Sequence, residues 1–140
     1  MKLELAVRRR STPQDERALR TLALAAVDLT GGVALVACGE ITLDCKATDV
    51  RPALARLRRL GFEQLLDVDI RPIRDDVLVV YHLLSISRGA RLRVRTRLGE
   101  QVLPEVADIY ASALGLETLA VALWQIETGR ARRPDAGAAR

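Results

Sequence analysis

Aromatic and metal-ligating side chains are scarce in this sequence. Phe, Trp and Tyr together make up 3% of the 140 residues. This argues against a reader of single-stranded nucleic acid, because such proteins stack bases on aromatic rings. The chain has one histidine, His82, and two cysteines, Cys38 and Cys45, with no Cys-x-x-Cys spacing. These residues argue against a zinc site. Gly31-Gly32 is not followed by Gly-Lys-Ser/Thr, so the pair indicates a turn and not a phosphate-binding loop.

Long hydrophobic runs are also missing. Residues 1–10 contain no apolar run long enough for a signal peptide. The longest apolar stretch, residues 22–38, is interrupted by Asp28, Thr30 and the two glycines, so it does not read as a membrane span. We therefore expect a cytoplasmic protein.

Charge of neither sign dominates strongly. The formal net charge is +4 and the pI is about 9.7, with the excess owed more to arginine than to lysine. Such a balance permits nucleic acid, a membrane surface or an acidic protein as the partner and selects none of them.

Hydrophobic periodicity and turn residues predict three helices and five strands. In chain order we expect a helix over 13–27, a hairpin over 33–47, a helix from Thr48 or Asp49 to Leu60, strands over 63–70, 77–86 and 91–98, and a helix over 105–127. Residues 1–12 are expected to be flexible and residues 128–140 to form a disordered basic tail. This order predicts a single α+β domain over residues 13–127, in which helices pack on one face of a mixed or antiparallel sheet.

The two cysteines flank the predicted hairpin. With Gly39-Glu40 as its two-residue turn, Cys38 lies opposite Ile41 and Cys45 opposite Ala34. The cysteines then share a face but lie about 13 Å apart along the strands. A disulfide requires Cα atoms closer than about 7 Å. We therefore expect two buried thiols that serve packing.

The sequence contains no clear set of catalytic residues. His82 lies in the middle of a predicted strand, where a histidine usually has a structural role with one satisfied hydrogen bond. Asp67 and Asp69 are two positions apart and share a face, so they could act as an acid–base pair. Two carboxylates on a solvated sheet face, or paired with neighbouring arginines, are the more ordinary interpretation.

Arginine alternates with a smaller side chain over RLRVRTRL, residues 91–98. On a strand, Arg91, Arg93, Arg95 and Arg97 therefore share one face and span about 20 Å. We call these four residues the arginine row. Three interpretations of the arginine row stay open. It could be a solvated face with acidic residues on adjacent strands, a binding surface for an acidic protein, or a surface that binds nucleic acid in a salt-sensitive and sequence-independent way.

Three segments resemble a known family: LLDVDI, VLVVYHLLSISRGARLRVRTRLGE, and the VADIYASALGLE that follows. They are similar to the 30-kDa subunit, also called the C subunit, of respiratory NADH–quinone oxidoreductase (complex I), and to its relatives in energy-converting hydrogenases. The resemblance covers residues 40–127. The last segment keeps the family pattern at Val106, Asp108, Ile109, Tyr110, Ala113, Leu116 and Glu117. It departs from that pattern at Gly115, Leu119, Ala122 and Gln125.

The resemblance implies a non-catalytic structural subunit in the hydrophilic arm of a membrane-associated redox complex. Such a subunit binds no cofactor or metal itself. It docks on a large quinone-site or hydrogenase-type subunit and a small iron–sulfur subunit, on the cytoplasmic side of the inner membrane. The resemblance places the partner interface at the arginine row, Tyr110 and Glu117. A small basic binding module for nucleic acid or another anionic partner remains the alternative, because fold alone does not fix function.

Overall fold

A computed structural model describes residues 13–128 of the chain. The helices and strands follow one another as α2 (Pro13–Thr30), β1 (Val33–Ala37), β2 (Glu40–Asp44), the short 3₁₀ helix η1 (Ala47–Asp49), α3 (Val50–Leu60), β3 (Gln64–Ile73), β4 (Asp76–Ser85), β5 (Ala90–Arg97) and α4 (Ala113–Thr128). The predicted flexible ends, 1–12 and most of 128–140, lie outside the described residues.

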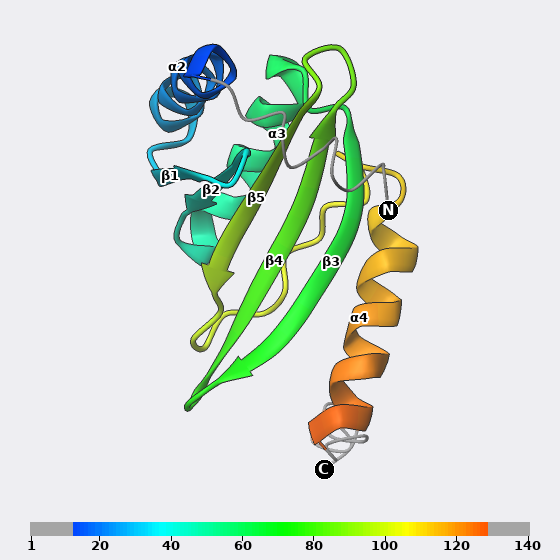
Figure 1. The fold of residues 1–140 in the computed structure, drawn as a ribbon. Coiled ribbons are helices and arrows are strands. Elements are labelled where there is room, and N and C mark those ends of the chain that lie inside the picture. The colour runs from blue at the N-terminus through cyan, green and yellow to red at the C-terminus, as the bar shows by residue number, and fades with distance from the viewer. Residues whose placement is uncertain (1–12, 129–140) are drawn as a thin grey trace, which may run out of the picture.

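The five strands form one mixed sheet in the order β1-β2-β5-β4-β3. The pair β2–β5 is parallel, and the other neighbours are antiparallel. Figure 1 shows α3 behind the sheet, α2 at the β1 end of the sheet, and α4 running beside β3, with no helix in front of β3, β4 and β5. The predicted α+β class, with a mixed sheet and helices on one side, is confirmed. None of the helices in the described part of the chain is both long and apolar enough to cross a membrane.

Alternation along the strands divides the sheet into two faces. On β5, Leu92, Val94 and Thr96 are buried, whereas the arginines between them are exposed or half-buried. Successive side chains of a strand point to opposite faces, so the apolar parity packs inward. The inner face meets α3 through Val50, Ala53, Leu54 and Leu57, all buried. We call the opposite face, which carries the arginine row, the outer face.

The end of α3 agrees with its sequence. Gly61 adopts a φ of 122°, which side chains disfavour, and the Phe62 amide donates to the Leu57 carbonyl. The start of α3 lies slightly later than predicted, at Val50, with Asp49 at the N-cap position and making no side-chain capping bond.

The last helix begins later than predicted. Residues 105–112 were expected to be helical, but α4 starts at Ala113 and the preceding segment crosses behind the strands (Figure 1). Contacts from distant residues hold this segment: Arg58 donates to the Ile109 carbonyl, and the Tyr110 hydroxyl donates to the Phe62 carbonyl. These tertiary bonds override local helix preference.

The first hairpin turns one residue earlier than predicted. Its two-residue turn is Cys38-Gly39, with φ values of 54° and 75°, and Ala37 pairs with Glu40. Positive φ at both central positions is typical of the tight turns that fit the twist of a hairpin. Cys38 is therefore exposed at the tip, which corrects the expectation of two buried thiols, and Cys45 is half-buried. Both cysteines are free.

Candidate functional site

The arginine row follows the central strand of the sheet. The antiparallel register places Arg91, Arg93, Arg95 and Arg97 beside Leu84, His82, Val80 and Leu78 of β4. On the other side, the parallel register brings Thr42 beside Arg93 and Asp44 beside Arg95. The row therefore lies between two strands, and its central members have an acidic strand for a neighbour.

The two central arginines are paired within the chain. Arg95 donates from Nε to Asp44 Oδ1 at 2.7 Å and from Nη2 to Oδ2 at 3.0 Å, which is a bidentate pair. This hydrogen bonding raises the pKa of Arg95. Arg93 Nη2 lies 3.1 Å from Glu40 Oε1. The expectation of acids on an adjacent strand is thus met for Arg93 and Arg95.

The two end arginines are different. Arg91 and Arg97 are exposed, and within residues 13–128 no ion pair involves either of them. Arg97 is near Asp76, whose pKa is lowered first by the backbone hydrogen bonds from Val77 and Gly99 and further by the charge of Arg97. Exposed guanidinium groups outside an ion pair can still bind carboxylates of another molecule through their planar fork. Of the arginine row, these two residues are the ones available to a partner.

His82 has a carboxylate partner that the sequence analysis did not assign to it. Its Nε2 lies 3.0 Å from Asp69 Oδ2, and Arg71 Nη2 lies 3.6 Å from the same oxygen. Asp67 accepts a hydrogen bond from the Val68 amide. Asp67 and Asp69 therefore have different hydrogen-bond partners. Neither Asp69 nor His82 lines the two cavities described below.

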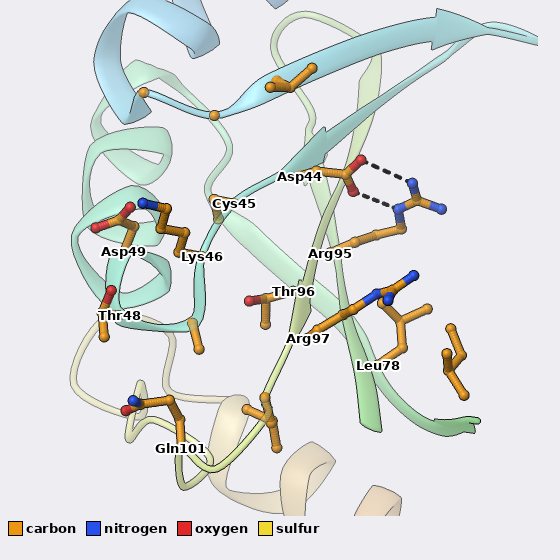
Figure 2. Close-up of a pocket in the computed structure, with 16 residues that line it drawn as sticks. Asp44, Cys45, Lys46, Thr48, Asp49, Leu78, Arg95, Thr96, Arg97 and Gln101 are labelled. Carbon is orange, nitrogen blue, oxygen red and sulfur yellow. Dashed lines mark hydrogen bonds and ion pairs between the residues drawn. The ribbon is translucent and has the colours of Figure 1, made fainter. Parts of the chain in front are cut away.

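A cavity of about 850 Å³ opens where β2 separates from β5, as Figure 2 shows. Arg95 and Asp44 point toward one another on one side of it, and Arg97 lies next to them. The hydroxyl of Thr96 points the other way, toward the loop of Lys46, and it is buried without a hydrogen-bond partner in the described chain. The cavity is thus lined by both acidic and basic side chains and by one hydroxyl group without a hydrogen-bond partner in the described chain.

The chemistry available in this cavity is binding and not nucleophilic attack. Cys45, the thiol that lines it, has its pKa raised to about 11, first by burial and then by the nearby carboxylates of Asp49 and Asp44. A thiol in that state is protonated at neutral pH and is a poor nucleophile. Among the described residues no three His, Cys, Asp or Glu side chains are placed to hold a metal ion.

A second hollow, of about 790 Å³, lies between the start of α4 and the segment that precedes it. We call it the Glu117 groove; its lining includes Arg51, Val102, Glu105, Asp108, Leu114 and Glu117. Arg51 is held there by Asp108 in a two-bond ion pair and also donates to the Glu105 carbonyl at 2.6 Å. The hydrogen bond from Arg51 lowers the pKa of Asp108.

Glu117 has no such partner among residues 13–128. Its Oε2 is buried and accepts no hydrogen bond from them. Burial, and then the charge of Glu105, raise the pKa of Glu117 to about 7 from an ordinary value of 4.5. The same carboxylate lies near enough to Tyr81 to raise the pKa of that phenol, after burial, which is the larger cause. The groove therefore contains an ionisable group that the described chain leaves unsatisfied.

This arrangement predicts a pH-dependent stability. Because the folded pKa of Glu117 exceeds the unfolded one, the folded chain binds more protons between pH 4.5 and about 7, and stability falls as pH rises through that window. We expect Glu117→Gln to reduce the fall between about pH 5 and about pH 8 by on the order of 1 kcal/mol, a value discounted for solvent screening of this half-exposed group. Urea unfolding at both pH values measures the change in the free energy of unfolding, with Glu100→Gln as the control. An equal change with pH in the two variants would contradict the raised pKa of Glu117.

Tyr110 is placed inside the fold. Its side chain is 3% exposed, its hydroxyl donates to the Phe62 carbonyl at 2.7 Å, and the Arg58 guanidinium lies 5.9 Å from the ring centroid. Burial raises the pKa of the phenol. The predicted interface is thus spatially divided: the arginine row is on the outer face, Glu117 lines its own groove, and Tyr110 is buried in the core.

The exposed apolar side of α4 was missed by the sequence analysis. Leu123 is 50% exposed, and Leu114, Leu119 and Ile126 are exposed as well. A signal was present in the sequence, because this helix carries apolar residues on nearly all sides and has no clearly polar face. The apolar surface of such a helix is typically buried against another domain or another protein as well as against its own domain.

Comparison with known proteins gives the chain a family. A sequence model of the family described as respiratory-chain NADH dehydrogenase, 30 Kd subunit, matches residues 43–126. The C subunits of NADH-quinone oxidoreductase from Burkholderia mallei and Burkholderia pseudomallei are 39% identical over 105 residues, which cover 64% of this chain and 52% of each relative. The chain thus spans about half the length of the curated relatives it matches. The comparisons confirm the resemblance found in the sequence.

Two solved structures share the fold. A chain of the membrane-bound sulfane sulfur reductase, described as an archaeal respiratory membrane complex, has a TM-score of 0.62 and 21% identity, covering 72% of this chain and 62% of that one. The trypsin-resistant fragment of Nqo5 has a TM-score of 0.61 and 24% identity, covering 77% and 92%. At these identities the similarity concerns the fold alone.

Proposed function

Because the chain belongs to the family of the 30-kDa subunit of respiratory-chain NADH dehydrogenase, we propose that it is a non-catalytic structural subunit of a membrane-associated redox complex. Its role is to dock the subunits of the hydrophilic arm against one another. The proposed partners are a large quinone-site or hydrogenase-type subunit and a small iron–sulfur subunit. The chain binds no cofactor of its own and reaches the cytoplasmic side of the inner membrane through these partners.

The observation that carries the proposal is the outer face of the sheet. It is free of helices in the described chain, and among the described residues neither Arg91 nor Arg97, at the two ends of the arginine row, forms an ion pair. Charge complementarity of this kind sets the register and the rate of association in protein assemblies. The central pairs of Arg93 and Arg95 hold the row in place, so that the end arginines project from an ordered strand.

An affinity purification tests the proposal. The tagged protein is purified from its native cells in mild detergent at low and at high salt, and the co-purifying proteins are identified by mass spectrometry. We expect a large quinone- or hydrogenase-type subunit and a cluster-bearing small subunit in stoichiometric amounts at both salt concentrations. Recovery of nucleic acid that is lost at high salt, without redox subunits, would instead support a basic binding module.

A further inference from the structure

The carboxylate of Glu117 is in an environment that a folded protein normally avoids. A buried polar atom without a hydrogen-bond partner is destabilising, and more so when the group carries charge. Native structures leave few such atoms, and each calls for a physical explanation. Here Oε2 of Glu117 has no donor within the described chain.

The position of Glu117 on α4 turns part of its side chain toward the core. Ala113 and Ala120, one turn to either side, are 0% and 6% exposed and belong to the core. Residues three and four apart share one side of a helix, so Glu117 lies on the core side of α4. The Tyr81 hydroxyl, which also lacks a hydrogen-bond partner within residues 13–128, is close enough to sense its charge.

The described residues that line the groove include no free cation for Glu117. Arg51 is the one guanidinium among them, and that group is already bound to Asp108 and to the Glu105 carbonyl. The remaining charged lining, Glu105 and Glu117, is negative. The groove is therefore locally anionic on a chain whose net charge is +4.

The rim of the groove is apolar. Val102 is 83% exposed and Leu114 is 67% exposed, and both line the hollow. Further along α4, Leu119, Leu123 and Ile126 form a separate exposed apolar strip, because the five residues from Leu114 to Leu119 turn the helix by about 140°. Lysine and arginine pack their aliphatic stems on apolar surface while the charged head reaches a carboxylate, so both fit an anionic base below an apolar rim.

We propose that the Glu117 groove receives a lysine or arginine side chain from a segment of another subunit, whose flanking aliphatic residues cover Val102 and Leu114 at the rim. This interface rests on the proposed function, and it lies apart from the arginine row. The incoming cation donates a charge-assisted hydrogen bond to Oε2 of Glu117. Glu117 is thus an interface residue whose ionised form is unsatisfied until the partner binds.

Photo-crosslinking in the assembled complex tests the proposal. p-Benzoylphenylalanine replaces Leu114 in the tagged chain, the complex is irradiated in native cells, and the crosslinked peptide is sequenced by mass spectrometry. Ile86, exposed on the turn between β4 and β5, is the control position. We expect position 114, and not position 86, to crosslink to a peptide of a co-purifying redox subunit that contains lysine or arginine within a few residues of the crosslink.

Neutralising the carboxylate gives the matched measurement. Glu117→Gln keeps the shape of the side chain and should leave the isolated chain folded, yet we expect it to reduce the co-purified subunit about tenfold at high salt relative to wild type. Glu100→Gln, an exposed carboxylate in the turn after β5, should have no effect.

The possible failures are distinguishable. If wild type co-purifies with redox subunits but Glu117→Gln behaves as Glu100→Gln does, the groove proposal is overturned and the proposed function stands. Crosslinks from position 114 that reach only residues of this same chain, or lipid, also overturn it. If wild type recovers no redox subunit at all, both the proposed function and the groove interface are rejected.

Discussion

Arg91→Glu combined with Arg97→Glu is expected to weaken association with the partner subunits by about 100-fold while leaving the fold intact. Like charges brought together across an interface cost several kcal/mol, and these two side chains would face acidic partner groups with the wrong sign. We expect the isolated domain to stay folded because both side chains are exposed and neither is in an ion pair within the described chain; the one nearby acid is Asp76, close to Arg97. Quantitative co-purification, calibrated by a dilution series of the wild-type complex, measures the loss.

A charge-matched control separates docking from general electrostatics. Arg20→Glu combined with Arg59→Glu alters the net charge by the same amount, but these exposed residues lie on α2 and α3 and not on the arginine row. We expect this variant to associate nearly as wild type does. Equal losses in both double variants would show that net charge alone matters, and the specific role of the outer face would be rejected. Arg93→Glu is a poorer test, because it would also set a carboxylate against Glu40.

Phe62→Ala is expected to lower the free energy of unfolding by about 3–5 kcal/mol, a large part of the stability of a domain of this size. Phe62 is the chain's one phenylalanine and is fully buried in the core between the end of α3 and the start of β3. The backbone carbonyl that accepts from Tyr110 remains in the variant, so the loss reports packing and the cavity left behind. Urea unfolding monitored by circular dichroism measures it.

Two further substitutions define what Phe62 contributes. Phe62→Leu keeps most of the volume and should cost about 1 kcal/mol. Tyr110→Phe removes the hydroxyl and its bond to the Phe62 carbonyl, which should cost about 1 kcal/mol as well. A loss below about 1.5 kcal/mol for Phe62→Ala would mean that the surrounding core collapses into the space, and that the ring is not a central packing element.

The strands and their faces were predictable because they depend on local alternation. The period-two pattern of RLRVRTRL assigned each arginine of the row to the outer face, and the register confirms this assignment. The wrong prediction of the hairpin turn still assigned the side chains of β1 and β2 to the correct faces of the sheet. Moving the turn to Cys38-Gly39 shifts the pairing by two positions, and only an odd shift exchanges the two faces of a strand.

The missed features depend on contacts between distant residues. No local pattern shows that Arg58 would bind the Ile109 carbonyl and keep residues 105–112 out of α4. The acids that pair with Arg93 and Arg95 come from β2, and Asp44 is 51 positions from Arg95 in the chain. The unsatisfied state of Glu117 follows from which neighbours it lacks, which only the packed structure reveals. Its identity as a candidate interface residue came from family resemblance alone.

The order of assembly during folding follows from the sheet topology. Short turns join β3, β4 and β5, so these strands can pair early, whereas β2 must find β5 across a long intervening segment at a greater loss of chain entropy. Until β2 docks, Arg93 and Arg95 lack Glu40 and Asp44, and all four arginines of the row are unneutralised. A nascent or partly unfolded chain therefore presents a more cationic strand than the native protein does. Electrostatics favours contact of that form with polyanions, and pairing of β2 with β5 reduces this tendency by neutralising Arg93 and Arg95.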